Sequence, residues 1–406
     1  MTPDLHADTD DSLAVGLRAA LSSRANLIAA VLLLLIFIGG AVKWADEGNN
    51  VDVIAAAFPG WNLVENGSLE LSDYAGANPW FVETETGVWS NRSPGIVAVS
   101  TVSYLLTAPF TDSFEMWPSA VAAVAMTFVS VLIVAAVAHR EREELFLPTL
   151  LLLGAGTATW GVASGQLWPH GPAQLGVAIA VWFYSRDRFW GAGIGLALAI
   201  LIRPPVAVLT LILGLGLGWV RRSWRPVLGI GVPSAVAGGL VLAYNQALFG
   251  SLSPAASYEA AGGSFGGRGG SDWLSNFAEG LLSLQIGLLT WSSWILVTLA
   301  ALVYAWKRVK PDHRLAVVGA FVFLGVHYWL NRASGGLPYN YRYPIEVLAV
   351  MTPALMVTVP ALLKHRMTRP VLAFAGAVSL FLQGSYVLFS GCVDVSAEIA
   401  QCRLFG

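Results

Sequence analysis

The sequence predicts an all-α polytopic membrane protein, and three observations lead to this fold class. Of the 406 residues, 56% are apolar and only 12% are charged, which is about half the charged share of soluble domains. The apolar residues form repeated runs close to the ~20 residues that a membrane-crossing helix needs. The basic residues gather in clusters between those runs. A chain of this kind has no room for a large soluble domain, so a cytosolic enzyme is excluded.

Charge and cysteine content exclude two further classes of protein. The formal net charge is -2, and the basic residues do not form the concentrated basic face that binding to phosphate backbones requires. Nucleic acid is therefore not expected as a partner. The chain has only two cysteines, which are too few for a cysteine-ligated zinc cluster or a disulfide-rich scaffold.

Residues 1–24 are predicted to be a cytoplasmic N-terminal tail. They carry several acidic residues and lack the basic start of a cleavable secretory signal, and they precede the first apolar run, at 25–43. The later basic clusters lie between apolar runs, and the positive-inside rule places each of them in the cytoplasm. They are Arg140 and Arg142; Arg186 and Arg188; Arg221, Arg222 and Arg225; Lys307, Arg308, Lys310 and Arg314; and Lys364, Arg366 and Arg369.

Parity then sets the crossings, since two clusters on one side are separated by an even number of spans. The run 189–220 begins and ends inside, so it is predicted to be a hairpin that turns at Arg203-Pro204-Pro205, where proline ends a helix. Between the outer Asp46 and the inner Arg140 only an odd number of spans is allowed. We therefore predict that 118–138 crosses and that 93–110 is an outer juxtamembrane or re-entrant helix.

About 11 spans result, with the N-terminus in the cytoplasm and the C-terminus outside. The transmembrane domain covers 25–390, and its large outer loop, 45–117, is the only segment long enough to shape a site outside the bundle. Residues 391–406 form an outer tail in which a disulfide between Cys392 and Cys402 is expected; two unrelated thiols are the alternative. The predicted spans are 25–43, 118–138, 145–163, 172–185, 189–202, 204–220, 226–247, 281–306, 314–330, 344–363 and 370–390.

The outer loop opens with an acid pair, Asp46-Glu47, directly after the first span. Neighbouring carboxylates on a helix point about 100° apart, so one can face a cleft while the other caps a helix; two solvated capping residues are the alternative. An amphipathic stretch follows and is predicted to be a short helix on the membrane that stops at Asn66-Gly67.

This loop resembles the first outer loop of GT-C-type membrane glycosyltransferases, the superfamily of aminoarabinose, protein O-mannosyl and arabinofuranosyl transferases. The resemblance covers about residues 25–363. It is carried by the acid pair with the short helix after it and by further segments in the family's order: Trp89-Ser90-Asn91-Arg92-Ser93-Pro94-Gly95, Gln166-Leu167-Trp168-Pro169-His170-Gly171-Pro172, Leu201-Ile202-Arg203-Pro204, Asn245-Gln246-Ala247-Leu248-Phe249-Gly250-Ser251, Gly287-Leu288-Leu289 and Gly335-Gly336-Leu337-Pro338-Tyr339-Asn340-Tyr341-Arg342-Tyr343-Pro344.

The resemblance implies an inverting glycosyltransferase that takes a sugar from a polyprenyl-phosphate donor and transfers it to an acceptor hydroxyl at the outer face. Asp46 is then the general base and Glu47 its helper. The cations that hold the carrier phosphate are Arg203, Arg342 and Arg332, since a guanidinium group matches phosphate oxygens, with His170 as a further ligand of phosphate or sugar. The residues expected to contact substrate are Arg92, Trp168, Tyr339 and Tyr341.

Arg203 stands out because its flanking spans are short. Runs of 14 and 17 residues, 189–202 and 204–220, fall below the ~20 of a full crossing, so the turn is predicted to lie beneath the outer surface. A charge there usually has a partner or a function, although its side chain can also extend to the lipid headgroups. For His170 and the tryptophans, the alternative to a role in substrate binding is that they anchor the protein at the membrane interface.

Cofactors and partners follow from the same reading. Asp46, Glu47, Asp52 and His170 could share a divalent Mg²⁺ or Mn²⁺ ion, yet no spacing of a dedicated metal site occurs. The expected partners are a polyprenyl-phosphate sugar, a glycan, lipid or protein acceptor, and membrane lipids, in the inner membrane of a bacterium. The rival readings are a flippase, which predicts two related halves, and a relative that binds polyprenyl lipids without catalysis.

Overall fold

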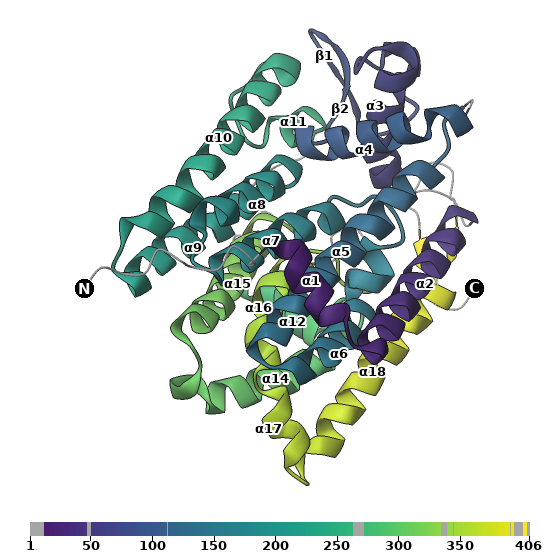
Figure 1. Cartoon of the computed structure of the whole chain (residues 1–406). Coiled ribbons are helices and arrows are strands. Elements are labelled where there is room, and N and C mark those ends of the chain that lie inside the picture. The colour runs from purple at the N-terminus through teal and green to yellow at the C-terminus, as the bar shows by residue number, and fades with distance from the viewer. Residues whose placement is uncertain are drawn as a thin grey trace.

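The computed structural model describes residues 12–46, 50–111, 113–262, 272–333, 339–343 and 345–389, together with the backbone of 391–393 and 401–403; at 45–46 only the backbone is described. These segments form a bundle of helices with two short β-hairpins (Figure 1). The all-α class predicted from composition is confirmed.

Five helices are long and apolar enough to cross a membrane. They are α2 (Arg24–Asp46), α5 (Trp117–Glu141), α10 (Trp224–Phe249), α15 (Pro311–Leu330) and α18 (Thr368–Phe389). Shorter helices complete the bundle: α6 (Phe146–Thr149), α7 (His170–Tyr184), α8 (Phe189–Ile202), α9 (Val206–Arg221), α12 (Trp273–Leu282), α13 (Leu288–Trp291), α14 (Ser293–Tyr304), α16 (Ile345–Met356) and α17 (Val359–Lys364).

The helices fall where the apolar runs predict spans, but several spans are broken. The predicted span 145–163 begins as α6 and continues as two π-helical segments, Leu150–Ala155 and Thr159–Ala163. The predicted span 281–306 is divided between α13 and α14, with the end of α12 before them. Non-regular backbone at such depth is tolerated only where protein covers it. The number of 11 crossings stays a prediction.

Small residues let the central helices approach closely. A Cβ atom at Gly176 of α7 would lie 2.6 Å from the carbonyl oxygen of Gly195 on α8, and one at Gly193 would lie 2.1 Å from that of Gly229 on α10. Helix association in membranes relies on such close backbone contact, because lipid removes the hydrophobic driving force. At one edge of the bundle α2 and α18 run side by side (Figure 1), where Lys43 Nζ donates to the Leu388 carbonyl at 2.6 Å.

An outer layer covers one end of the bundle and consists of α3 (Val51–Asn66), the hairpin of β1 (Phe81–Thr84) with β2 (Gly87–Ser90), α4 (Pro94–Thr107) and α11 (Ala256–Ala260). Helix α3 ends at Asn66 with Gly67 in the left-handed conformation, φ 71°, as predicted. The layer has its own small core around Phe58. A Cβ atom at Gly95 would lie 2.6 Å from the Leu201 carbonyl carbon, so α4 begins directly against the end of α8.

Part of the predicted cytoplasmic tail is helical. Helix α1 (Leu13–Leu21) is capped by the Ser12 side chain, and a Cβ atom at Gly16 would lie 2.1 Å from the Trp182 ring at the end of α7. At the other end of the chain, β3 (Gly391–Val393) pairs with β4 (Gln401–Arg403) and places Cys392 opposite Cys402. Directly opposed residues are close enough for a disulfide, and that disulfide stays a prediction.

Candidate functional site

Arg203 lies at the tip of the α8–α9 hairpin with its side chain only 10% exposed. It does not extend to the surface, which agrees with the burial that the two short spans predict. Its Nη1 donates to Glu346 Oε1 on α16 at 2.6 Å. His170 Nδ1, at the start of α7, lies 2.8 Å from the same oxygen and also contacts the Arg203 guanidinium. Three helix ends therefore bring a cation, an acid and an imidazole together inside the bundle.

A second ion-paired group lies where the outer layer meets the bundle. Arg342 Nη1 donates to Asp52 Oδ2 at 2.8 Å, and Arg92 Nη2 donates to Asp52 Oδ1 at 2.5 Å. Burial alone would raise the pKa of the Asp52 carboxyl, but the charges of Arg92 and Arg342 outweigh burial and hold that pKa well below its ordinary range. Asp52 is thus a permanent anion that orients both guanidinium groups.

Tyr343 joins the two groups. Its ring centroid lies 4.4 Å from that of His327 and 6.0 Å from that of His170. The guanidinium carbons of Arg342 and Arg203 lie 5.2 Å and 5.7 Å from the same ring, within the range of cation–π attraction. The described charged and imidazole side chains around this ring therefore form one cluster, and Trp168 packs on Arg342 at 4.7 Å.

Among its described side chains, the cluster carries one more positive charge than negative charges. Its described members include three guanidinium groups, Arg92, Arg203 and Arg342, but only two carboxylates, Asp52 and Glu346. Several of its buried polar atoms also have no partner among the described residues: Glu346 Oε2, Arg342 Nε, Arg92 Nε and both ring nitrogens of His327. Buried charges and polar groups left unpaired are costly, so the cluster has the chemistry of a site that receives an anionic, hydrogen-bonding ligand.

The loop that carries Arg342 and Tyr343 is held in place by the two residues before them, Asn340 and Tyr341. Asn340 adopts φ 65°, its backbone N–H donates to the Gln285 carbonyl at 2.8 Å, and its side-chain amide donates to Gln383 Oε1 of α18 at 2.8 Å. The Tyr341 hydroxyl contacts Ser292 at 2.6 Å and accepts from the Ala158 N–H at 3.1 Å. Both side chains point into the helical core and hold the loop so that the next two residues face the cluster.

The residues predicted from sequence divide into three sets. Arg203, Arg342, His170, Trp168 and Arg92 all belong to the cluster. Tyr341 lies in the helical core beneath it, Tyr339 is partly buried, and Arg332 is exposed at the end of α15. Asp46 is the last residue of α2, while Glu47 and the side chain of Asp46 lie outside the described residues.

Sequence reasoning missed Glu346, His327 and the pairing of Asp52. A signal for Glu346 exists, because it is an acid within the predicted span 344–363, and an ionisable residue inside a span marks a function by default. His327 within the predicted span 314–330 is a similar signal. The sequence indicates Asp52 only as a candidate metal ligand, yet both of its carboxylate oxygens accept from arginines.

Among the residues that the structure describes, no three His, Cys, Asp or Glu side chains gather as metal ligands would. With its oxygens held by Arg92 and Arg342, Asp52 does not fit a divalent cation well, since two bound cations would oppose a third. The prediction that Asp46 and Glu47 hold Mg²⁺ or Mn²⁺ concerns side chains outside the described part of the chain and stays a prediction.

The low pKa of Asp52 predicts a particular pH dependence of stability. A carboxyl whose pKa is depressed by folding stabilises the fold above its unfolded pKa, and this contribution is lost as pH falls toward the folded value. We expect the melting temperature to be insensitive to this group from pH 8 to 5 and to fall below about pH 4. Tryptophan-fluorescence melting of the parent and of Asp52→Asn tests this. Asp52→Asn should already melt lower at pH 7, and an equal melting temperature at pH 7 would contradict the prediction.

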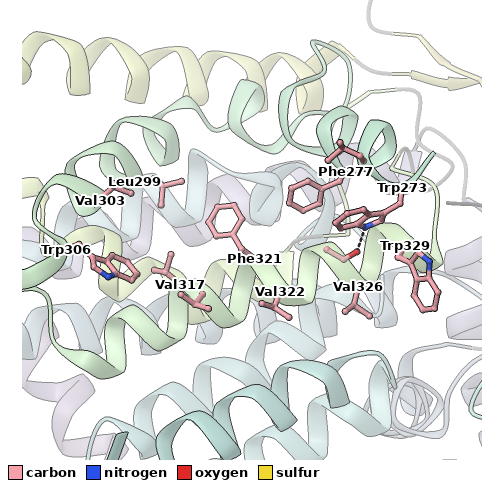
Figure 2. Close-up of a pocket in the computed structure, with 13 residues that line it drawn as sticks. Trp273, Phe277, Leu299, Val303, Trp306, Val317, Phe321, Val322, Val326 and Trp329 are labelled. Carbon is pink, nitrogen blue, oxygen red and sulfur yellow. Dashed lines mark hydrogen bonds between the residues drawn. The ribbon is translucent and has the colours of Figure 1, made fainter. Parts of the chain in front are cut away.

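An apolar groove runs along the outside of the bundle between α12, α14 and α15 (Figure 2). Its volume is about 830 Å³. Figure 2 shows Trp306 at one end of the groove and Trp273 and Trp329 at the other, which suits tryptophans at the two membrane interfaces. The groove is lined by Trp273, Leu274, Phe277, Leu299, Val303, Trp306, Val317, Val318, Phe321, Val322, Gly325, Val326 and Trp329.

Comparison with known proteins gives a likeness of fold. No family model matches the sequence, and no curated protein matches it. Two solved structures of ArnT from Cupriavidus metallidurans match the fold with a TM-score of 0.54 over 89% of this chain. One is bound to undecaprenyl phosphate, is 13% identical and is covered over 70% of its length; the other is in the apo state, is 12% identical and is covered over 75%. The chain therefore has the fold of ArnT, which confirms the resemblance to GT-C-type membrane glycosyltransferases at the level of fold.

Proposed function

We propose that this protein is a membrane glycosyltransferase that moves a sugar from a polyprenyl-phosphate donor to an acceptor hydroxyl at the outer face of the membrane. The observation that carries the proposal is the cluster around Tyr343, whose described side chains have one excess positive charge. The cluster lies beneath the layer formed by α3, the β1–β2 hairpin and α4. ArnT, which has a similar fold, has been solved with bound undecaprenyl phosphate. A lipid phosphate is an anion that would balance that charge.

Arg342 and Arg203 are assigned to the carrier phosphate. Arg342 donates a hydrogen bond to Asp52, and Arg203 donates one to Glu346. Each carboxylate therefore orients its guanidinium group before the phosphate binds. Groups oriented in advance stabilise the charge that develops on a leaving phosphate without reorganisation at the moment of reaction. His170 and Trp168 pack against these two arginines and complete the phosphate site.

The apolar groove is assigned to the isoprenoid chain of the donor. Helix α15 presents Val322 and Val326 to the groove, while Phe323 and His327, one residue further along the helix in each case, face the interior. A chain lying in the groove would therefore run along the outside of the helix that supplies His327 to the cluster. Because the isoprenoid is already surrounded by hydrocarbon in the membrane, the groove would hold it by van der Waals packing against the lining side chains and not by removing it from water.

In the transfer step, Asp46 is assigned the role of general base. Its carboxylate takes the proton of the acceptor hydroxyl as that oxygen attacks the anomeric carbon, and the bond from that carbon to the phosphate oxygen breaks. The electron pair leaves with the phosphate, where the arginines stabilise it. A single displacement of this kind inverts the anomeric configuration. Glu47 is assigned to orient Asp46.

The phosphate assignment is tested by Arg342→Gln. Because Asp52 keeps Arg92 as a partner, this variant should fold, while its retention of undecaprenyl phosphate in native mass spectrometry should fall about tenfold to hundredfold. Arg222→Gln is the matched control and should bind as the parent does, because Arg222 is exposed at the end of α9, which the charge pattern predicts to be cytoplasmic. Arg332→Gln should have a smaller effect than Arg342→Gln, since Arg332 is exposed.

Retention equal to that of the parent in Arg342→Gln would place the phosphate elsewhere. The two rival functions give different results in the same preparation. A flippase would move labelled donor between leaflets without forming a glycoside, and a non-catalytic relative would retain undecaprenyl phosphate without doing either.

A further inference from the structure

The base of the β1–β2 hairpin holds a group of polar side chains of which only Arg92 also belongs to the cluster around Tyr343. Trp80 and Asn91 flank the hairpin and continue its ladder, since the Asn91 N–H donates to the Trp80 carbonyl at 3.0 Å. The Arg92 guanidinium carbon lies 5.6 Å from the Trp80 ring. We call Trp80, Asn91 and Arg92 the hairpin patch. Through Arg92, which pairs with Asp52, the patch lies against the first turn of α3.

Four side-chain atoms of the hairpin patch are buried without a partner among the described residues. They are Trp80 Nε1, Asn91 Nδ2, Asn91 Oδ1 and Arg92 Nε. Asn91 as a whole is only 1% exposed, so both halves of its amide are removed from water and neither is satisfied. Native proteins avoid such atoms, and each one calls for a reason such as a bound ligand or water. Trp80 itself is only partly buried, so a ligand at the surface of the outer layer can contact its ring.

The side chains of the hairpin patch favour a neutral, hydroxyl-bearing ligand over a phosphate. Arg92 shares the Asp52 carboxylate with Arg342, and the other two members of the patch, Trp80 and Asn91, are uncharged. Asn91 Oδ1 is an acceptor and would repel a phosphate oxygen, whereas the amide as a whole both donates and accepts. A hydroxyl group also does both. A tryptophan ring beside such an amide provides an apolar face for the C–H side of a sugar ring. Neutral polyols thus fit better than phosphates.

We infer that the hairpin patch is a sugar-binding subsite in which Asn91 pairs with a sugar hydroxyl and Trp80 packs on the ring. The inference rests on the proposed glycosyltransferase function, and it deepens that function by separating recognition of the sugar from recognition of the phosphate. The sugar belongs either to the donor or to the acceptor, because both must meet near the acid pair that precedes α3.

The test compares Asn91→Leu with Asn78→Leu. Asn78 is a matched control in the same loop, 2% exposed, but its amide donates to the Val51 carbonyl and accepts from the Trp80 N–H, both at 2.9 Å. Losing a paired amide destabilises a fold, whereas replacing an unpaired one by an apolar group of similar size does not. In ligand-free protein we expect Asn78→Leu to lower the melting temperature and Asn91→Leu to leave it unchanged or raise it.

Binding is measured with methyl mannoside, methyl arabinofuranoside and methyl glucoside by saturation-transfer NMR. We expect at least one glycoside to bind the parent and to bind Asn91→Leu about tenfold more weakly. Undecaprenyl phosphate without a sugar should bind both proteins equally. In transfer assays, a tenfold rise in the KM of the donor assigns the subsite to the donor's sugar, and the same rise for the acceptor assigns it to the acceptor.

Two results would overturn the inference. If Asn91→Leu binds every methyl glycoside as well as the parent does, the hairpin patch does not bind sugars. If, in addition, that variant melts as low as Asn78→Leu, an ordered water satisfies the amide and the patch is structural. Glycoside binding that depends on Asn91 in a protein that neither retains undecaprenyl phosphate nor transfers a sugar would instead uphold the subsite and reject the proposed function.

Discussion

Asp46→Asn is expected to abolish sugar transfer while binding of the polyprenyl-phosphate donor stays near that of the parent. A positioned general base contributes about 10²- to 10⁴-fold to a rate, and an asparagine cannot accept the acceptor's proton. Asp46 ends α2, and five residues later the chain begins α3, whose Asp52 pairs with Arg342 and Arg92. The backbone thus places the acid pair within a short loop of the charged cluster.

The measurement is single-turnover transfer from labelled donor in lipid nanodiscs. Glu47→Gln serves as the matched control, because it removes the adjacent charge but leaves Asp46, and its effect should be milder. A transfer rate in Asp46→Asn equal to that of the parent would remove Asp46 from the mechanism. A larger loss in Glu47→Gln than in Asp46→Asn would exchange their roles.

The second large effect is expected at Arg203. In Arg203→Met the carboxylate of Glu346, which is 0% exposed, loses its only guanidinium partner among the described residues. Removing one member of a buried ion pair costs about 3–5 kcal/mol in free energy of unfolding, so this variant should melt well below the parent. Donor binding should fall as well, because Arg203 is one of the two cations assigned to the phosphate.

The double variant Arg203→Met/Glu346→Gln separates these two effects. With both charges gone, no unpaired buried ion remains, and most of the lost stability should return. Donor binding should not return, since the cation is still absent. The melting temperature and donor retention are measured for Arg203→Met, for Glu346→Gln and for the double variant, which together form a double-mutant cycle. Losses of stability that simply add would show that Arg203 and Glu346 do not interact.

Several features of this protein were readable in the order of its residues. Asn66-Gly67 marks the end of α3 because glycine adopts the left-handed conformation without strain. The two short apolar runs around Arg203 predict a charge sunk below the surface, because too few residues remain to cross. Proline at 94 predicts the start of a helix, and α4 begins at Pro94, while its position against the membrane, which the odd parity between the outer acids and Arg140 predicts, stays a prediction.

Other features came only with the three-dimensional arrangement. Glu346 lies 143 residues from Arg203 and 176 from His170 along the chain, and no local pattern relates these three positions. The unpaired amide of Asn91 depends likewise on what surrounds it, since the same Asn91-Arg92-Ser93 segment could equally sit in solvent.

The sequence by itself therefore determined the helical membrane class, the order of the apolar segments and the helix that ends at Asn66-Gly67, because hydrophobicity and helix-ending residues act over a few positions of the chain. The tertiary structure alone decided which charges pair, which arginine stays on the surface and which polar atoms remain unsatisfied. These properties depend on the packing of distant helix ends, where burial and a nearby opposite charge set the energy of an ion.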